Sequence, residues 1–418
     1  MAKRGIDVVL YDMKPHSFTP AHKNPNFCEL VCSNSLKSND SLVASGLLKR
    51  ELEAFDSIVL KCANECKVAA GGALAVDRDL FADTVTKRIK ELKNIEIVNA
   101  VVEDIPKDSD FTIVATGPLT DGKLLDKLKE MLDMDNLSFF DASSPIVSYA
   151  SVDKNLSFVG DRYGKGNGDY VNCPMNKEEY ENFYNELINA ETVQLHKFEK
   201  KEIFESCMPI EIMAKRGKDS IRFGPLKPVG LTNPKTGEKP YAVVQLRKED
   251  EEGINYNLVG FQTNLTFGEQ KRVFSMIPAL HNAEYIRYGV MHRNSFVNAP
   301  VVLEKTFQLK KFNNIFIAGQ LSGVEGYVES IMAGLISAIN CYLLINQKSP
   351  LNLSSKTMIG AIINYITTGY SKNFQPMNAN FGIIEPLDIV IRDEKLKKQK
   401  YFERSMEEIN KEVERVFW

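Results

Sequence analysis

The sequence lacks an uninterrupted apolar stretch of the roughly 18 residues that a membrane-spanning helix needs. The nearest candidate, residues 332–345, is interrupted by Ser337 and Asn340. The first residues, Met-Ala-Lys-Arg-Gly, also lack the long apolar segment of an export signal. We therefore expect a cytoplasmic protein that has no membrane partner.

Cysteine is scarce and its number is odd, with seven in 418 residues. Such a count in a long chain without an export signal indicates reduced thiols rather than a disulfide framework. Two pairs, Cys28/Cys32 and Cys62/Cys66, are separated by three residues, whereas the close pairs of structural zinc sites more often have two-residue gaps. We expect no metal site.

Positive charge is not in excess, because 52 Lys and Arg face 55 Asp and Glu and give a net charge of −3. The 44% hydrophobic and 26% charged residues are typical of a soluble globular protein. Local basic runs beside aromatic rings are either solvated faces or surfaces that hold unstacked RNA. The candidate RNA-binding residues are Lys200, Lys201, Arg216, Arg222 and Phe223.

A glycine loop is missing where a dinucleotide-binding unit would have one. Residues 6–11 (IDVVLY) have the apolar, β-branched character of a buried parallel strand, and Asp12 follows them. In a dinucleotide-binding unit an acidic residue at this place binds the ribose, about 20 residues after a G-x-G-x-x-G turn. Only eleven residues precede Asp12. Either the chain starts at an internal methionine, or it is a truncated copy of a longer protein. For Asp12 itself, the alternative to a ribose contact is an ordinary acidic turn after a strand.

Strands and helices alternate in the first and last thirds of the chain, whereas the middle is rich in Pro and Gly turns. The chain is also too long for one ordinary domain. The expected helices are residues 45–55, 77–92 with Asp77 as the N-cap, 326–344 and 393–418. The expected strands are residues 95–102, 111–115, 241–246, 258–261 and 314–318. This pattern predicts an α/β protein with an inserted α+β domain, divided into residues 1–170, 171–293 and 294–418.

A glycine-rich turn joins the last expected strand to its helix, within residues 314–340. Gly319, Gly323 and Gly326 permit a pyrophosphate to approach backbone N–H groups, and a helix N-terminus favours its negative charge. Gln320 lies in the same turn. The alternative is a tight turn that only packs the helix against the strand.

Two cysteines differ from the others in their polar surroundings. Cys32 lies in LVCSNS, and Cys207 lies in FESCMP. In such turns a thiol can be solvated and deprotonated to its nucleophilic form. The alternative for each is a buried structural cysteine.

Ten blocks in order identify a resemblance that covers nearly the whole chain. The blocks are ELVCSNSL (29–36), AGGALAVDR (70–78), ATGPLT (115–120), YVNCPM (170–175), FESCMPIE (204–211), RFGPLKPVGL (222–231), EQKRVFSMIP (269–278), RYGVMHRNSF (287–296), AGQLSGVEGYVES (318–330) and FQPMNANFG (374–382). The chain resembles the folate- and FAD-dependent RNA uracil-5-methyltransferases, the methylenetetrahydrofolate–tRNA-(uracil-5)-methyltransferases, a family once grouped with the glucose-inhibited division proteins. The N-terminal glycine loop of that family is the part that this chain lacks.

The resemblance implies a Rossmann-like FAD-binding domain and a defined chemistry. A thiolate adds to uracil C6, C5 becomes nucleophilic, and 5,10-methylenetetrahydrofolate supplies the carbon through reduced FAD, which NAD(P)H reduces. The family's two required cysteines correspond to Cys207, for attack on C6, and Cys32, for proton transfer; the alternative assignment exchanges the two roles. The FAD contacts implied are Asp12, Thr116, Gly117, Gly319, Gln320, Gly323 and Gly326.

The resemblance implies tRNA, at its T-loop, as the substrate and 5-methyluridine as the product. Some members of the family act on large-subunit rRNA with the same chemistry, and no residue here separates the two RNAs. Two further alternatives are a flavin-deficient RNA-binding relative and a small-molecule FAD oxidoreductase. The second of these would require neither RNA nor two reactive thiols.

Overall fold

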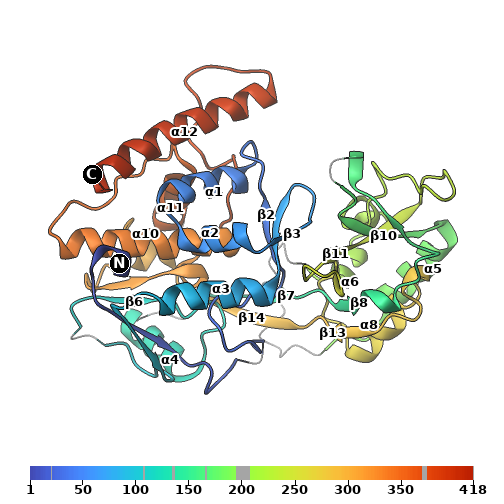
Figure 1. The fold of residues 1–418 in the computed structure, drawn as a ribbon, viewed down its shortest axis with the longest axis horizontal. Helices are drawn as coiled ribbons and strands as arrows, with labels where there is room; N and C mark the ends of the chain where they lie inside the picture. The colour runs from blue at the N-terminus through green and yellow to red at the C-terminus, as the bar shows by residue number, and fades with distance from the viewer. Residues whose placement is uncertain are drawn as a thin grey trace.

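Two pairs of short parallel strands form the strand layer of the first unit (Figure 1). The computed structural model describes residues 1–19, 21–106, 109–133, 137–164, 167–193, 208–369 and 374–417. The paired strands are β1 (Val8–Asp12) with β5 (Ile95–Asn99), and β6 (Thr112–Val114) with β15 (Ile315–Ile317). Parallel neighbours need a crossover connection, so this arrangement confirms the α/β class expected from the alternating pattern. All three residues of β15 are buried, as its apolar sequence predicts.

Helices surround these strands and form most of the larger hydrophobic core. They are α1 (Ala44–Ala54), α2 (Ile58–Glu65), α3 (Arg78–Lys90), α4 (Gly122–Leu132), α9 (Ala299–Val302), α10 (Tyr327–Ile345), α11 (Met358–Thr368) and α12 (Glu394–Phe417). Helix α1 contacts α10, α11 and α12, and α12 lies along the outside of this layer (Figure 1). Asp77 caps α3 as expected, because its carboxylate accepts a hydrogen bond from the Leu80 N–H.

Helix α10 is the central helix of this unit. Among the described helices it alone is long and apolar enough to cross a membrane, with a mean hydropathy of 1.7. More than half of its apolar stretch is buried inside the protein, against α1 and the turn that precedes it. The apolar composition of α10 is therefore accounted for by its place in the core.

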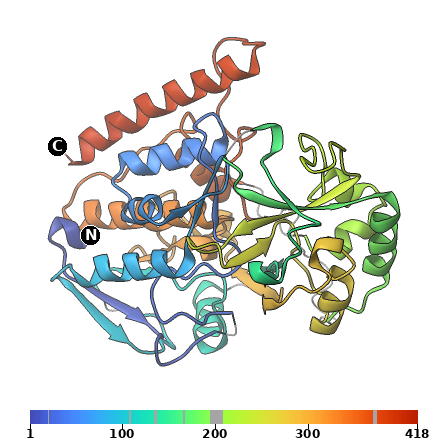
Figure 2. The ribbon, with the colours of Figure 1, turned by 45° about the vertical axis from the view of Figure 1, so that its right-hand side comes forward.

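The second unit contains an antiparallel sheet of six strands in the order β13-β8-β12-β11-β10-β9. Its strands are β8 (Ile146–Ser148), β9 (Phe158–Val159), β10 (Tyr170–Met175), β11 (Ala242–Lys248), β12 (Asn255–Leu258) and β13 (Tyr285–Arg287). The helices of this unit are α5 (Lys177–Asn189), α6 (Ile210–Lys215), α7 (Ser220–Phe223) and α8 (Phe267–Phe274), and they share a second hydrophobic core with the sheet (Figure 2).

An antiparallel ribbon of β7 (Leu137–Ala142) and β14 (Met291–Phe296) connects the two units (Figure 1). The chain thus leaves the first unit along β7 and returns along β14. The domain boundary predicted at residue 170 does not coincide with the start of this sheet. Strands β8 and β9 precede residue 170 and yet pair within the sheet of the second unit. Both strands are only two or three residues long, too short for their alternation to be read from sequence.

A small sheet completes the first unit beside the connecting ribbon. Its three strands have the order β2-β4-β3 and are β2 (Ser35–Ser38), β3 (Lys67–Val68) and β4 (Ala73–Val76). The strand expected at residues 258–261 is corrected by the structure, since β12 ends at Leu258 and Gly260 has a φ of +77°. Positive φ is the conformation that glycine adopts without strain, so this segment turns instead of continuing.

Candidate active site

The thiol of Cys32 contacts the first residue of helix α10. Its Sγ lies 3.3 Å from the Tyr327 hydroxyl oxygen, and the Cys32 N–H donates a hydrogen bond of 3.0 Å to the same oxygen. Tyr327 directly follows the glycine-rich turn. The structure therefore brings together a cysteine and a turn that the sequence identified separately, 295 positions apart.

The loop that carries Cys32 is held by hydrogen bonds from both units. From the first unit, the Arg78 guanidinium donates to the carbonyls of Leu30 and Val31. Asn34 is fully buried and its side-chain amide donates to the carbonyls of Val76, at 3.0 Å, and Lys248, at 2.9 Å. A buried amide that bridges two strands from different units fixes the loop between them.

Charged side chains at the end of β11 complete this junction. Arg78 forms an ion pair with Glu249, and both side chains are largely buried. Arg247 donates to the Asn34 side-chain oxygen at 3.1 Å and to the Ser33 hydroxyl at 2.9 Å. The second unit thus contributes directly to the position of the Cys32 loop, and buried, hydrogen-bonded charges of this kind tolerate little displacement.

Burial keeps the Cys32 thiol protonated at rest. Desolvation, together with the negative charges of Asp141 and Glu325, raises the pKa of Cys32 to about 12, against the hydrogen bond with Tyr327 and the charge of Arg78, which lower it. Burial also raises the pKa of the Glu325 carboxyl to about 8. Glu325 accepts a hydrogen bond from the Gln320 side-chain amide. The site therefore holds a neutral thiol and a carboxyl that changes protonation near neutral pH.

The three glycines of the turn have different surroundings. Gly319 has a φ of +67°, and a Cβ placed on it would meet nothing within 4 Å. Gly323 has a φ of +89°, and its Cβ would approach the Phe374 ring to 2.7 Å. Gly326 has a φ of +109° and faces Glu329 and Lys37. All three have positive φ, but only Gly319 has open space beside its Cβ position.

The second turn proposed for a cofactor lies beside the first. The Ala318 N–H donates to the Val114 carbonyl at 2.9 Å, so β15 and β6 end together and their following turns are neighbours. Thr116 shares a hydrogen bond of 2.7 Å with the Thr120 hydroxyl. Gly117 has a φ of +80°, and its Cβ position is also open. Two open glycine backbones at the carboxyl ends of parallel strands form the kind of cradle that a dinucleotide needs.

Asp12 ends β1, on the other parallel pair. One of its carboxylate oxygens accepts a hydrogen bond of 2.8 Å from the Lys14 N–H. The end of a parallel strand is the place where an acidic residue meets a ribose in dinucleotide-binding folds. Its role remains a prediction.

A buried carboxylate, Glu329, anchors the helix that follows the turn. Glu329, on α10, is completely buried and accepts hydrogen bonds of 2.9 Å from Lys37 and from the Ala379 N–H. The Glu325 N–H donates to the Met377 carbonyl at 2.9 Å. The FQPMNANFG block (374–382) thus lies against the glycine-rich turn.

Sequence reasoning missed several residues that the structure places here. Glu325 and Tyr327 were visible only as neighbours of the glycines, without a sign of their function. Arg78 and Glu249 pair across 171 positions of sequence, and nothing local in the sequence indicates such a pair. Asp141, at the end of β7, lies near enough to affect the pKa of both Cys32 and Glu325.

The described residues among those expected to bind RNA are not gathered at this site. Lys200, Lys201 and the second cysteine, Cys207, lie outside the described residues. Arg216 ends helix α6. Arg222 packs over the Tyr241 ring at 3.9 Å and donates to the Tyr241 carbonyl at 3.0 Å, whereas Phe223 is 64% exposed. Arg222 therefore stabilises the second unit itself, while Phe223 presents its ring to solvent.

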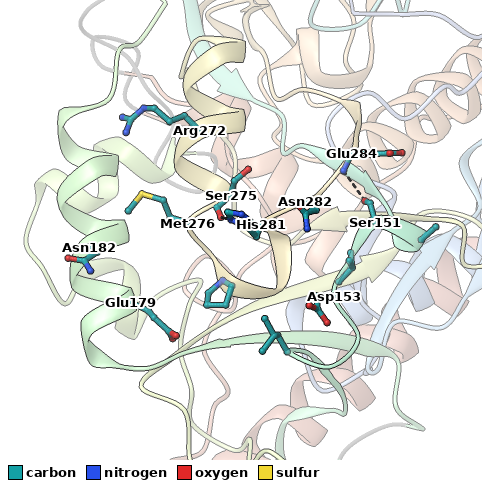
Figure 3. A pocket seen from close by; sticks show the side chains of 14 residues that line it. Ser151, Asp153, Glu179, Asn182, Arg272, Ser275, Met276, His281, Asn282 and Glu284 are labelled. Carbon is teal, nitrogen blue, oxygen red and sulfur yellow. Dashed lines mark hydrogen bonds between the residues drawn. The ribbon is translucent and has the colours of Figure 1, made fainter.

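A surface groove of about 980 Å³ lies elsewhere, between α5, α8 and the turn after β8 (Figure 3). Its lining includes Asp153, Glu179, Glu284, Arg272 and His281, and none of the candidate site residues. Arg272 is already paired with Glu186 and Glu269. Within the described parts of the chain, no three His, Cys, Asp or Glu side chains gather in a way that would hold a metal ion.

Comparisons with known proteins place the whole chain in one family. Residues 1–349 match the family described as glucose inhibited division protein A. A protein of Acetivibrio thermocellus named methylenetetrahydrofolate–tRNA-(uracil-5-)-methyltransferase TrmFO is 54% identical over 406 residues, which are 97% of this chain and 92% of that protein. The proteins of the same name from Fusobacterium nucleatum and Bacillus subtilis are 53% and 51% identical, over 100% and 98% of this chain and 95% and 94% of their own lengths.

Solved structures agree on the fold. The form II crystal structure of Aquifex aeolicus GidA matches 99% of this chain and 70% of its own chain, with a TM-score of 0.69 at 16% identity. The form I crystal structure of the same protein gives a TM-score of 0.68. At this identity the likeness concerns the fold alone. The sequence matches go further: the chain belongs to the glucose inhibited division protein A family, among relatives named as folate-dependent tRNA uracil-5-methyltransferases.

Proposed function

We propose that this chain methylates C5 of a uridine in tRNA, with 5,10-methylenetetrahydrofolate as the carbon donor and 5-methyluridine as the product. Relatives that share half of its residues over almost its whole length carry this activity in their names. The single observation that carries the proposal is the contact between Cys32 and Tyr327, because it joins a thiol to an open glycine turn. A small-molecule FAD oxidoreductase would not require a thiol at this place.

The two adjacent turns are the proposed FAD site. Gly319 and Gly117 leave their Cβ positions open, so their backbones can be approached closely, and Gln320 and Thr116 stand beside them. Gly323 and Gly326 shape the same turn, and Asp12 is proposed for the adenosine ribose. Bound reduced FAD supplies the hydride that turns a methylene into a methyl, and we propose NAD(P)H as its reductant.

Cys32 is proposed as the proton-transfer residue. A thiol whose pKa is raised to about 12 by burial stays protonated at neutral pH and is a weak resting nucleophile. The Tyr327 hydroxyl at 3.3 Å offers it a partner that both donates and accepts. Proton transfer at C5 needs such a positioned pair.

Cys207 is proposed as the nucleophile that adds to C6. The new Sγ–C6 bond places negative charge on C5 and the O4 oxygen, so that C5 attacks the one-carbon unit. The C5 proton then leaves to a base, and loss of the Sγ–C6 bond restores the aromatic uracil. Because the Cys32 thiol is protonated at rest, the proposed acceptor is the ionised form of the Glu325 carboxyl, whose charge acts on Cys32. Cys32 and Tyr327 are proposed to relay the proton to it.

The test uses the purified full-length chain with FAD, NAD(P)H, labelled methylenetetrahydrofolate and unmodified tRNA transcript. We expect label in 5-methyluridine at the T-loop. Large-subunit rRNA fragments, incubated in parallel, test the alternative substrate of the same chemistry. Label in rRNA alone would overturn the choice of tRNA, and absence of label from both RNAs would overturn the methyltransferase proposal.

A further inference from the structure

Three aromatic rings form a ladder on the second unit, and none of them belongs to the candidate site described above. The rings of Tyr285 and Tyr288 are 5.1 Å apart at their centroids and 11° from parallel. The rings of Tyr288 and Phe267 are 4.8 Å apart and 15° from parallel. Tyr285 and Tyr288 are partly buried, but Phe267, the first residue of α8, is 54% exposed. The stack therefore ends in a ring that is open to solvent.

The scaffold beneath the ladder is rigid. Gln270 is completely buried, and its side-chain amide donates to the Gly289 carbonyl while its oxygen accepts from the Gly289 N–H, both at 2.8 Å. This pair locks helix α8 to the segment that carries Tyr288. A Cβ on Gly289 would approach the Ser143 carbonyl oxygen to 2.6 Å, so the backbone is closely packed there. A ring stack held in this way requires no rearrangement before it binds a further ring.

The ladder lies next to the candidate active site. Arg287 stands between Tyr285 and Tyr288 in the chain, and its guanidinium is close enough to Arg78, Tyr327 and Glu249 for their charges to act on it. These are the residues that surround Cys32. Adjacent positions of one chain segment, Arg287 and Tyr288, thus link the surroundings of Cys32 to the aromatic stack.

A cation accompanies the exposed ring. Lys271 follows Phe267 by four residues on α8, which places both on the same face of the helix. Lys271 is exposed and forms no ion pair among the described residues, whereas its neighbour Arg272 is paired with Glu186 and Glu269. An exposed ring can stack on a nucleic-acid base, and a cation one helical turn away can contact the phosphate of the same nucleotide.

We propose that Phe267 is a stacking platform for one unpaired base of the RNA substrate, beside the target uridine, and that Lys271 contacts its phosphate. This inference rests on the proposed RNA substrate. A uridine inside a folded loop must be unstacked before its C6 is accessible, and the neighbour that loses its stacking partner gains another on Phe267. Flat, nearly parallel rings with one open face favour a base over an irregular protein surface.

The test compares Phe267→Leu, which keeps an apolar side chain, with Phe267→Trp, which keeps a flat ring. The probe is a T-arm RNA hairpin that carries 2-aminopurine beside the target uridine. Wild type and Phe267→Trp are expected to quench the probe, and Phe267→Leu is expected to bind the hairpin about tenfold more weakly without quenching it. Lys271→Ala should lower the slope of log affinity against log salt by about one. Leu396→Ala, an exposed apolar residue of α12, is the surface control.

The two proposals fail in different ways. If wild-type protein formed no 5-methyluridine and bound no hairpin, the proposed function itself would be overturned. If wild type methylated RNA while Phe267→Leu kept full quenching and affinity, only the stacking platform would be refuted. A change in oligomeric state of Phe267→Leu, with unchanged RNA affinity, would likewise refute it and assign the surface to protein contact. Unaltered flavin absorbance and melting temperature verify that each variant is folded.

Discussion

The Cys32 thiol and the Tyr327 hydroxyl lie 3.3 Å apart, and the same hydroxyl accepts the Cys32 N–H. One oxygen therefore fixes both the backbone and the side chain of the cysteine. Because Tyr327 begins helix α10 immediately after the glycine-rich turn, the thiol lies beside the end of that turn. The position of the thiol is thus coupled to the region proposed for the cofactor.

Replacing Tyr327 by Phe removes this oxygen and keeps the ring. The hydrogen bond from Tyr327 lowers the pKa of Cys32, so its loss is expected to raise that pKa further. We expect kcat to fall about a hundredfold, within the range of a lost proton-transfer partner, while the affinity for RNA is unchanged. Methylation rates and RNA affinity, measured side by side for wild type and variant, test this. A kcat close to that of wild type, or a loss of RNA affinity that accounts for the lower rate, would contradict the proton-transfer role.

Gly319 and Gly323 provide a matched pair of substitutions. Gly319→Ala places a methyl group in open space, whereas Gly323→Ala places one against the Phe374 ring, and both strain a positive φ. We expect Gly319→Ala to lose flavin with a small change in melting temperature. Gly323→Ala is expected to lower the melting temperature by several degrees through packing. Absorbance of the purified proteins and thermal unfolding distinguish the two. Full flavin content in Gly319→Ala would show that this turn only packs.

Local signals in the sequence were sufficient for much of the fold. The Asp77 cap, the buried strand before Gly319 and the long helix after Gly326 each depend on neighbouring residues, and the structure confirms them. The polar turn around Cys32 was also visible in six residues, but the choice of Cys32 as a catalytic residue rests on the family resemblance. The structure places that turn against the glycine-rich segment, although its catalytic role stays a prediction.

Long-range pairing was not accessible from the sequence. The ion pair of Arg78 and Glu249 and the amide bridge from Asn34 to Lys248 join segments more than 170 positions apart. Charges and amides of this kind occur throughout the surface of a protein, so nothing marks these as partners. The two-residue strand β9 had no readable alternation either, and the first boundary of the inserted unit was therefore placed too late relative to its sheet.

Glu51 predicts a pH dependence of stability. This buried carboxylate of α1 accepts hydrogen bonds from the Met358 and Ile359 N–H groups at the start of α11 and from Ser405 on α12. Burial raises the pKa of Glu51 to about 7, above its value in the unfolded chain. Its contribution to stability is therefore fully present below about pH 4.5 and is lost as the pH rises to about 7.

Glu51→Gln removes this titration. The free energy of unfolding of wild type, minus that of Glu51→Gln, is expected to fall between pH 4.5 and 7 by on the order of 3 kcal/mol and then to level off. Urea unfolding at a series of pH values measures the difference. Glu403→Gln, an exposed carboxylate of α12, serves as the control. A difference that stays constant over this range would show that Glu51 has the same pKa in both states.

RNA that carries 5-fluorouridine at the target position assigns the two cysteines. Fluorine cannot leave C5 as a proton does, so the Sγ–C6 bond persists and the protein stays attached to the RNA. We expect Cys207→Ala to abolish this adduct on denaturing gels, because it removes the proposed nucleophile. Cys32→Ala is expected to keep the adduct and to lose turnover by at least a hundredfold, as for a missing proton-transfer group. The raised pKa of the Cys32 thiol supports this order, since a protonated thiol attacks poorly. An adduct that persists in Cys207→Ala and disappears in Cys32→Ala would exchange the two roles, and the Tyr327 hydroxyl would then be the group that activates the nucleophile.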